Sequence, residues 1–373
     1  MSDAEFEKIT NSAGTGAPNF TYGLNSGGSD SGLAGFAYTA SGTEPSSPAN
    51  GDVWFDTTND KYYTYINGEF KQITHENASS FWGGDRGFLM GGYKSTGFTD
   101  EIQYWDMATA SNASDFGDMT SARAENQGLS DGSRGISGKG YITGYTRTNI
   151  IEYITTATLG NATDFGDALG AAAQNGRNGA CDGTYGLFCG QDTSGYTDVI
   201  EILTVQTTGN TTDHGDLTQA RIYAPMANDA SRWLALGGYG AGGLNQTNII
   251  DYGTFTATGA TDFGDLITIG YNAGACSDET RALKAGGYTN SNQNAIEYVT
   301  IQTTGNATDF GDLIQANQGI AGMSNNTNGQ FAGTWSYATN IHTVVIQTTG
   351  NATDHGDLAT GVASPAGFSG AAS

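Results

Sequence analysis

A phrase of seven residues recurs six times in this chain and sets narrow limits on its architecture. Its first copy is Asn-Ala-Ser-Asp-Phe-Gly-Asp at residues 112–118, and the glycines of successive copies lie 49, 49, 49, 47 and 45 residues apart. Those glycines are Gly117, Gly166, Gly215, Gly264, Gly311 and Gly356. A period of 45–50 residues with strand-forming sequence inside each unit is typical of propeller blades. The repeats predict an all-β fold, a six-bladed β-propeller over residues 76–373.

Composition supports short strands joined by tight turns. Glycine contributes 57 of 373 residues, charged residues only 14%, and Thr, Asn, Ser and Tyr are abundant. These residues suit strands and turns, and we find no long apolar stripe with helical period.

Each unit has the same internal order. A first strand is followed by a second that ends in Gly-Gly-aromatic, a third that carries an acid beside an aromatic, and the repeated phrase as the fourth. The glycine step is complete at Gly91-Gly92, Gly237-Gly238 and Gly286-Gly287, and it is reduced to one glycine at Gly144, Gly190 and Gly333. The acid–aromatic step is Glu152-Tyr153, Asp251-Tyr252 and Glu297-Tyr298, and it is altered to Gln103-Tyr104, Glu201-Ile202 and His342-Thr343.

This order resembles the kelch repeat over nearly 300 residues. Kelch units usually place Trp in the final segment, whereas this chain has Phe116, Phe165, Phe263 and Phe310, with His214 and His355. The resemblance implies a kelch-like propeller in which glycines let strands approach the axis and aromatic side chains fill the space between blades. Because of the departure, no kelch partner is carried over.

The end of the chain predicts how the ring closes. After Leu358 the sequence continues as a linker and a first strand, with no further blade to begin. We expect this strand to pair into the first blade, near Phe81–Met90, which removes edges that could recruit other strands.

Residues 44–75 form a different unit. Val53–Phe55, Tyr62–Ile66 and Glu69–Ile73 read as three short strands, with turns at Thr57–Asp60 and Asn67-Gly68. The segment resembles a small module of bacteriophage tail-fibre and other virion proteins. The matching residues are Pro48, Gly51, Asp52, Trp54, Asp56, Thr57 and the aromatic stretch Tyr62–Phe70. The resemblance implies a virion protein.

Residues 1–43 are rich in Gly and Ser and have few apolar side chains. Ordering each residue costs roughly 1–2 kcal/mol of backbone entropy, so the segment cannot fold alone. We expect an extended arm that is ordered by contacts with another chain.

Charge excludes several classes of partner. The chain has 14 basic and 38 acidic residues, a formal net charge of −24. Such a surface repels phosphates and anionic lipids, so we expect neither nucleic-acid binding nor membrane insertion. Salt screens acidic surfaces, which fits a marine host. The N-terminus has no basic or apolar signal region, and no apolar run is long enough to span a bilayer, so we expect synthesis and assembly in the host cytoplasm.

The aspartates of the repeated phrase are the candidate metal ligands: Asp115, Asp118, Asp164, Asp167, Asp213, Asp216, Asp262, Asp265, Asp309, Asp312, Asp354 and Asp357. Calcium prefers such oxygen ligands, but the order of an EF-hand loop is missing. Two acids that flank a glycine also fit a turn in which Asp caps backbone N–H groups. Both interpretations stay open, and we assign no metal or cofactor residue.

Other reactive residues follow structural patterns. Cys181, Cys189 and Cys276 have no framework spacing and read as small buried residues. The histidines His75, His214, His342 and His355 fall in structural or repeat positions. The Asn-Ala-Thr triplets at Asn161, Asn306 and Asn351 match a glycosylation pattern but need only be turn residues. No phosphate loop, nucleophile elbow or metalloprotease helix occurs, so we predict no catalytic residue and a non-enzymatic protein.

Six loops that follow the glycine step differ between units and should cluster on one face. They are Lys94–Thr99, Thr146–Thr148, Asp192–Thr197, Gly240–Thr247, Thr289–Gln293 and Ser336–Thr339. Several combine Tyr or Asn with Gly, which suits contacts with sugars, although solvated turns would also vary freely.

Together these observations predict a bacteriophage structural protein, present in several copies per virion, that docks to other virion proteins through residues 1–75. Its propeller would serve as a tail-fibre or surface appendage for host recognition, with a host-surface glycan as candidate ligand. The alternative is a carbohydrate-binding propeller adhesin of a bacterium, and the third is a polysaccharide-active enzyme, since a fold alone assigns no chemistry.

Overall fold

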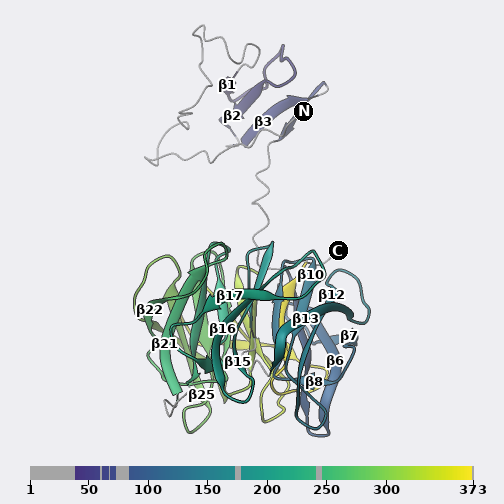
Figure 1. The fold of residues 1–373 in the computed structure, drawn as a ribbon. Coiled ribbons are helices and arrows are strands. Elements are labelled where there is room, and N and C mark those ends of the chain that lie inside the picture. The colour runs from purple at the N-terminus through teal and green to yellow at the C-terminus, as the bar shows by residue number, and fades with distance from the viewer. Residues whose placement is uncertain are drawn as a thin grey trace. The chain divides into compact units, whose positions relative to one another are not determined.

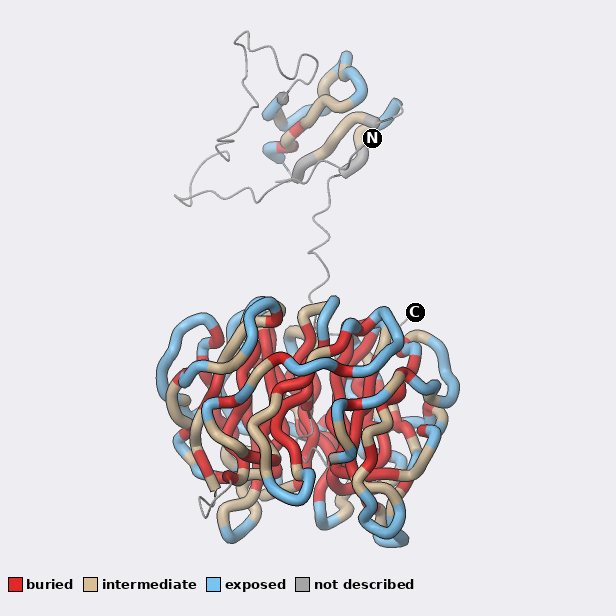
Figure 2. Tube along the Cα trace, in the orientation of Figure 1, coloured by how far each residue is buried: buried red, intermediate tan, exposed pale blue. Residues whose placement is uncertain are grey.

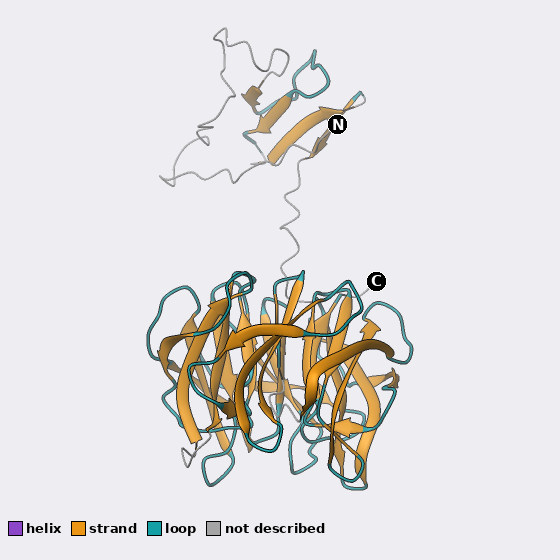
Figure 3. Cartoon of the chain, viewed as in Figure 1, coloured by secondary structure: helices purple, strands orange, loops and turns teal. Residues whose placement is uncertain are grey.

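The computed structural model describes residues 38–58, 61–66, 68–72, 84–172, 178–240 and 246–371. Every regular element among them is a strand, so the all-β prediction is confirmed (Figure 3). No helix in these ranges is long and apolar enough to cross a membrane. The chain divides into two compact units, Met1–Ala78 and Ser79–Ser373, and each is described by itself.

The first unit contains one four-stranded sheet. Its strands, in spatial order, are β1 (Tyr38–Ser41), β2 (Val53–Asp56), β3 (Lys61–Ile66) and β4 (Glu69–Gln72). Strands β2, β3 and β4 are the predicted antiparallel strands, and Trp54 stacks on Tyr63 with ring centroids 4.9 Å apart. Strand β1 pairs in parallel with β2 and comes from residues that the sequence interpretation placed in the arm. Arm residues 1–37, Asn67 and Ile73 lie outside the described residues.

Residues 84–371 of the second unit form six sheets of antiparallel strands. The first holds β31 (Ala366–Gly370), β5 (Arg86–Lys94), β6 (Gly97–Asp106) and β7 (Ser114–Asp118). The second holds β8 (Arg123–Ala124), β9 (Gln127–Ser130), β10 (Arg134–Gly138), β11 (Tyr141–Ile142), β12 (Thr146–Thr155) and β13 (Thr163–Ala172). The third holds β14 (Ala180–Cys181), β15 (Tyr185–Asp192), β16 (Tyr196–Thr204) and β17 (Thr212–Asp216).

The remaining three sheets repeat this plan. The fourth holds β18 (Arg221–Ile222), β19 (Met226–Asn228), β20 (Arg232–Gly240), β21 (Gln246–Thr254) and β22 (Thr261–Asp265). The fifth holds β23 (Gly274–Ser277), β24 (Arg281–Ala285), β25 (Gln293–Thr300) and β26 (Thr308–Asn317). The sixth holds β27 (Ala321–Ser324), β28 (Asn328–Ala332), β29 (Asn340–Val345) and β30 (Thr353–Asp357).

The innermost strands of the six sheets contact one another in a closed cycle, in the order β31, β9, β14, β19, β23, β27 and back to β31. The last strand of the chain, β31, pairs with β5 so that Ala366 lies opposite Met90 and Gly370 opposite Arg86. This is the pairing that the sequence predicted for the end of the chain. The first sheet therefore combines the two ends of the second unit.

The repeated phrase forms the outermost strand of every sheet, and its aromatic residue points inward. Phe116 is the extra residue of a bulge, since Asp115 lies opposite Gln103 and Gly117 opposite Ile102. The side chain of Phe116 packs against Phe88 in the core. A Cβ on Gly117 would lie 2.5 Å from a backbone oxygen of the next sheet, so only glycine fits there. Figure 2 shows buried strands inside and exposed turns at both ends.

Candidate functional site

Aromatic side chains gather at one end of the six sheets, where second strands end and third strands begin. We call this end the aromatic face, and it lies at the bottom of the second unit in Figure 1, near β8. Its rings form two groups. The first is Tyr93, Phe98, Tyr141, Tyr145 and Trp335, and the second is Tyr196, Tyr223, Tyr239, Tyr271 and Tyr288.

The first group joins three sheets. Tyr93 ends the second strand of the first sheet, and its ring centroid lies 4.8 Å from that of Phe98. Trp335, from the sixth sheet, lies 5.1 Å from Tyr93, and Tyr145, from the second sheet, lies 5.4 Å from Phe98. Tyr93 is buried, but 68% of Tyr145 and 36% of Trp335 are exposed. The group is a packed base with two accessible rings on it.

A charged pair borders this group. Arg147 donates a hydrogen bond to Asp192 at 2.8 Å, and the hydroxyl of Tyr141 donates to the same carboxylate at 3.2 Å. The guanidinium of Arg147 also lies over the Tyr141 ring, 5.8 Å from its centroid. Burial, followed by the charge of Asp192, raises the pKa of Tyr141, so its hydroxyl stays protonated as a donor. The site thus combines exposed rings with donors and acceptors.

The second group joins the third, fourth and fifth sheets. The ring of Tyr271 lies 5.2 Å from Tyr223, 5.1 Å from Tyr239 and 5.7 Å from Tyr288. Exposed aliphatic side chains, Leu169, Ile267, Ile269 and Ile314, follow the repeated phrase at the same end of their sheets. Surfaces of this kind are typical of interaction sites.

The predicted variable loops adjoin this site, but two of its exposed rings fall just outside them. Tyr145 and Trp335 each lie one residue before a predicted loop, Thr146–Thr148 and Ser336–Thr339. Residues 241–245 of the predicted loop Gly240–Thr247 lie outside the described residues. An aromatic residue next to glycine in a turn, as in Gly144-Tyr145, is the sequence signal that would have found the missed rings.

The acidic residue of the acid–aromatic step is buried and has a structural role. Glu152, Glu201, Asp251 and Glu297 are buried, as are Gln103 and His342 in the two units that lack the acid. Each of the four acids pairs with a buried cation: Arg123–Glu152, Lys139–Glu201, Arg221–Asp251 and Lys284–Glu297. The two units that lack the acid have a neutral side chain there, and within the described part of the chain neither side chain belongs to an ion pair.

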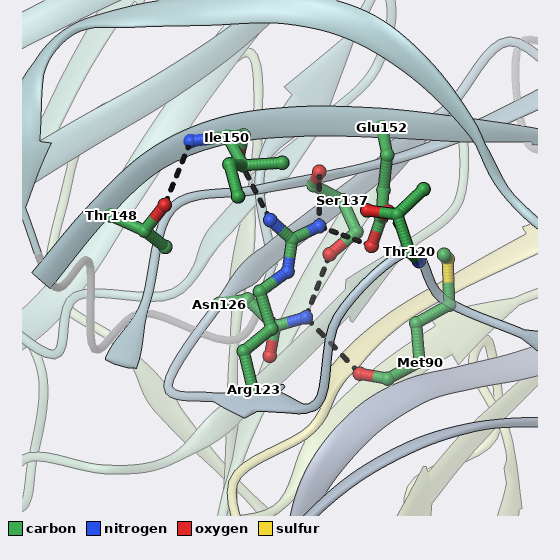
Figure 4. A network of polar contacts seen from close by, with 8 residues as sticks. All are labelled: Met90, Thr120, Arg123, Asn126, Ser137, Thr148, Ile150 and Glu152. Atoms are coloured by element: carbon green, nitrogen blue, oxygen red, sulfur yellow. Dashed lines mark hydrogen bonds and ion pairs between the residues drawn. The ribbon is translucent and has the colours of Figure 1, made fainter. Parts of the chain in front are cut away.

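Figure 4 shows one of these networks, around Arg123. The guanidinium donates to the Glu152 carboxylate and, at 3.0 Å, to the backbone oxygen of Ile150. Glu152 also accepts from the backbone N–H of Thr120 at 2.9 Å, which belongs to the segment leaving the preceding sheet. Burial lowers the pKa of Arg123, yet the pair keeps both charges satisfied. Strongly buried charges therefore join neighbouring sheets in this protein.

The structure corrects one glycine assignment. Gly144 lies in the turn after β11, and the glycine step of the second sheet is Lys139-Gly140. Lys139 has a φ of 62°, close to the 68° of Gly91 at the same place in the first sheet. Lysine is unusual in this left-handed region, and here its ammonium group reaches the buried Glu201 of the next sheet.

His342 predicts a measurable pH dependence of stability. Burial lowers its pKa from 6.5 to about 4, and its Nε2 accepts from Asn317 at 3.0 Å. Below pH 6.5 the unfolded chain gains a proton there that the folded protein does not, so stability falls as the pH drops toward 4. At pH 4.5 the loss from this group is about 2.5 kcal/mol.

The matched variant is His342→Gln, since Gln103 occupies this place in the first sheet. We expect urea unfolding at pH 7 and 4.5 to show a smaller difference for the variant than for the parent. Equal differences in the two proteins would show that His342 does not titrate as described.

The aspartates of the repeated phrase lie on the outermost strands, exposed or half-buried. Within the described ranges, no three His, Cys, Asp or Glu side chains gather where they could hold a metal ion. The predicted backbone cap occurs at Asp213, which accepts from Gly215 at 2.8 Å. The hydrogen bond that recurs between neighbouring sheets is instead accepted by the side chain of the first residue of the phrase. For example, Asn161 accepts from the backbone N–H of Asp118 at 3.0 Å. Charges on outer strands also discourage pairing with other edges.

The remaining candidates are structural. Cys181, Cys189 and Cys276 are buried free thiols, as predicted, and burial raises the pKa of Cys189 to about 12. His214 and His355 are buried in the place of the repeated phenylalanine. His75 lies outside the described residues.

A small cavity of about 70 Å³ lies among the first strands of the six sheets. The Asn178 side chain lies at this cavity and bonds to several of these strands. Its amide nitrogen donates to Gly322 at 2.6 Å and Gly367 at 3.0 Å, and its amide oxygen accepts from Ala275 at 3.1 Å. Asn178 therefore joins strands of three sheets and has a structural role.

Neither a scan against protein-family models nor a search of curated protein sequences finds a match for this chain.

Proposed function

We propose that this protein is a non-enzymatic structural protein of a bacteriophage virion that recognises the host surface through its aromatic face. The observation that carries recognition is the exposure of Tyr145 and Trp335, which both contact the buried Tyr93, in a group whose Tyr141 adjoins the Arg147–Asp192 pair. Exposed aromatic rings with a few polar groups are typical of ligand sites.

In this proposal the second unit is a six-bladed kelch-like β-propeller. The cyclic contacts of the first strands and the pairing of β31 with β5 support it. The aromatic face is then one end of the propeller, built from turns that differ between repeats over a common core. Variable turns on a rigid core suit recognition.

Residues 1–75 would dock to other virion proteins. The support is the aromatic sheet of the first unit, with Trp54 between Tyr63 and Phe70, and the resemblance of its sequence to a virion module. The acidic composition suits a particle surface that does not bind nucleic acid.

Immunogold labelling of purified particles with antibodies against residues 84–371 tests the virion role. We expect labelled particles, and we expect deletion of residues 1–43 to leave a soluble protein that no longer joins them. A protein found in host lysate and never in particles would overturn the virion role and favour the bacterial adhesin.

A further inference from the structure

We propose that Tyr145 and Trp335 form a stacking site for a pyranose ring of an uncharged glycan. Arg147 and Asp192, at the border of the same group, bind the hydroxyl groups of that sugar. The inference rests on the proposed recognition function and narrows it to one site and one class of ligand.

Folding does not account for the tyrosine at position 145. Its side chain is 68% exposed, so it contributes little burial. Its φ is 56°, in the left-handed region that costs a bulky residue strain. Gly144 precedes it with a φ of 84°, and Ile142 pairs with Thr146, so residues 143–145 form a three-residue turn, whose left-handed position normally carries glycine. A strained, exposed aromatic residue is more readily explained by binding than by stability.

The ring of Trp335 is held in place from below. Its backbone N–H donates to Gln318 at 3.2 Å, and its ring packs on Gly319, where a Cβ would lie 2.6 Å from the indole. Tyr93, which the indole also contacts, exchanges two backbone hydrogen bonds with Ala363, at 2.7 and 2.8 Å. The platform is therefore rigid before a ligand arrives, which lowers the entropic cost of binding.

The chemistry of the site points to an uncharged sugar. One side of a pyranose ring carries C–H groups that lie flat on an aromatic ring, and its edge carries hydroxyl groups. Arg147 and Asp192 can serve that edge, because their side chains are 33% and 17% exposed and offer donors and acceptors.

Charge argues against an acidic glycan. Two cationic side chains lie near the first aromatic group, and both are already paired. Arg147 pairs with Asp192, and Lys94 pairs with Glu101 at 2.5 Å. Arg123 and Lys139, which precede Tyr145 in the second sheet, are buried in ion pairs. With a net charge of −24, the protein repels anionic sugars over its whole surface.

The test is a glycan array with neutral, amino and acidic oligosaccharides, probed with the labelled full-length protein. We expect at least one uncharged glycan to bind. Tyr145→Asn keeps the left-handed turn and should weaken that binding about tenfold, as should Trp335→Ala, from the loss of one stacking contact. Tyr185→Ser is the matched control, because Tyr185 is 37% exposed at the opposite end of its sheet, and it should bind like the parent.

Thermal unfolding separates binding from stability. Tyr145→Asn should melt at the temperature of the parent or above it, because the strain at φ 56° is relieved. A large fall in melting temperature would assign Tyr145 to the fold and overturn the inference. Binding of acidic glycans alone, binding of no uncharged glycan, or undiminished binding by Tyr145→Asn would also overturn it.

The two proposals fail in distinguishable ways. Envelope fragments from the bacterium that yields the particles provide the second arm of the test. If the protein binds them and Tyr145→Asn binds equally well, recognition stands and this site is wrong. If an uncharged glycan binds through Tyr145 but particles lack the protein, the site stands and the virion role is wrong.

Discussion

A chain that ends at Pro365 should fail to form a stable second unit. The truncation removes β31, whose five residues Ala366–Gly370 are buried and fill the place of a first strand in the first sheet. It takes away the ladder to β5 and the ring of Phe368, which stacks on Phe88 at 5.3 Å. Loss of one buried phenylalanine costs 3–5 kcal/mol, so the whole strand should cost more than about 5 kcal/mol, comparable to the stability of a domain.

Urea unfolding followed by tryptophan fluorescence measures this effect. The truncated protein should aggregate or unfold without a cooperative transition, because β5 loses its partner and becomes an exposed edge. A chain that ends at Ala371 keeps β31 and should unfold like the parent. A cooperative transition at the same midpoint after loss of β31 would contradict the closure described here.

Glu152→Ala should lower the free energy of unfolding by about 3–5 kcal/mol. The change leaves the Arg123 guanidinium buried without its carboxylate, and it removes the acceptor of the Thr120 backbone N–H. The penalty comes from the uncompensated charge more than from the lost bonds. Chemical unfolding at pH 7 measures it.

The double variant Arg123→Met, Glu152→Gln is the control. It imitates the first sheet, where Gln103 stands at the acid position and accepts from the Thr360 backbone at 3.0 Å without a cation. We expect it to recover most of the loss, to within about 1.5 kcal/mol of the parent. If the double variant is as unstable as Glu152→Ala, the destabilisation has another cause than the unpaired charge.

Local regularities in the sequence were sufficient to predict most strands and their order, although β1 was placed in the arm. The repeated phrase and its period predicted the repeats, and the alternating pattern with Asn67-Gly68 predicted the hairpin in residues 44–75. The linker and first strand left over after the sixth repeat predicted the pairing of the last strand near Met90. These features depend on neighbours within one repeat, and six copies of the same pattern remove most of the ambiguity. The thiols were predicted as buried for the same reason, since other repeats place small residues at related positions.

The cations could not be matched to the buried acids from the sequence. Arg123 precedes its acid by 29 residues, whereas Lys139 pairs with an acid 62 residues later, in the next sheet. Lys139 also stands in the place of the first glycine of the glycine step. Because lysine rarely adopts the left-handed backbone, the step could not be recognised there from the sequence. Arg123, Arg221 and Lys284 meet acids of their own sheet, whereas Lys139 meets Glu201 only because two sheets pack against each other.

The candidate site likewise depends on the ring of sheets. Trp335 lies far along the chain from Tyr93 and Tyr145, and nothing near any of them in the sequence marks the others as partners. They meet because the first, second and sixth sheets are neighbours once β31 has joined β5. Sequence patterns report which residues share a strand or a turn, but contact between turns of different sheets is decided by closure, when buried apolar area and edge pairing bring the two ends of the second unit together.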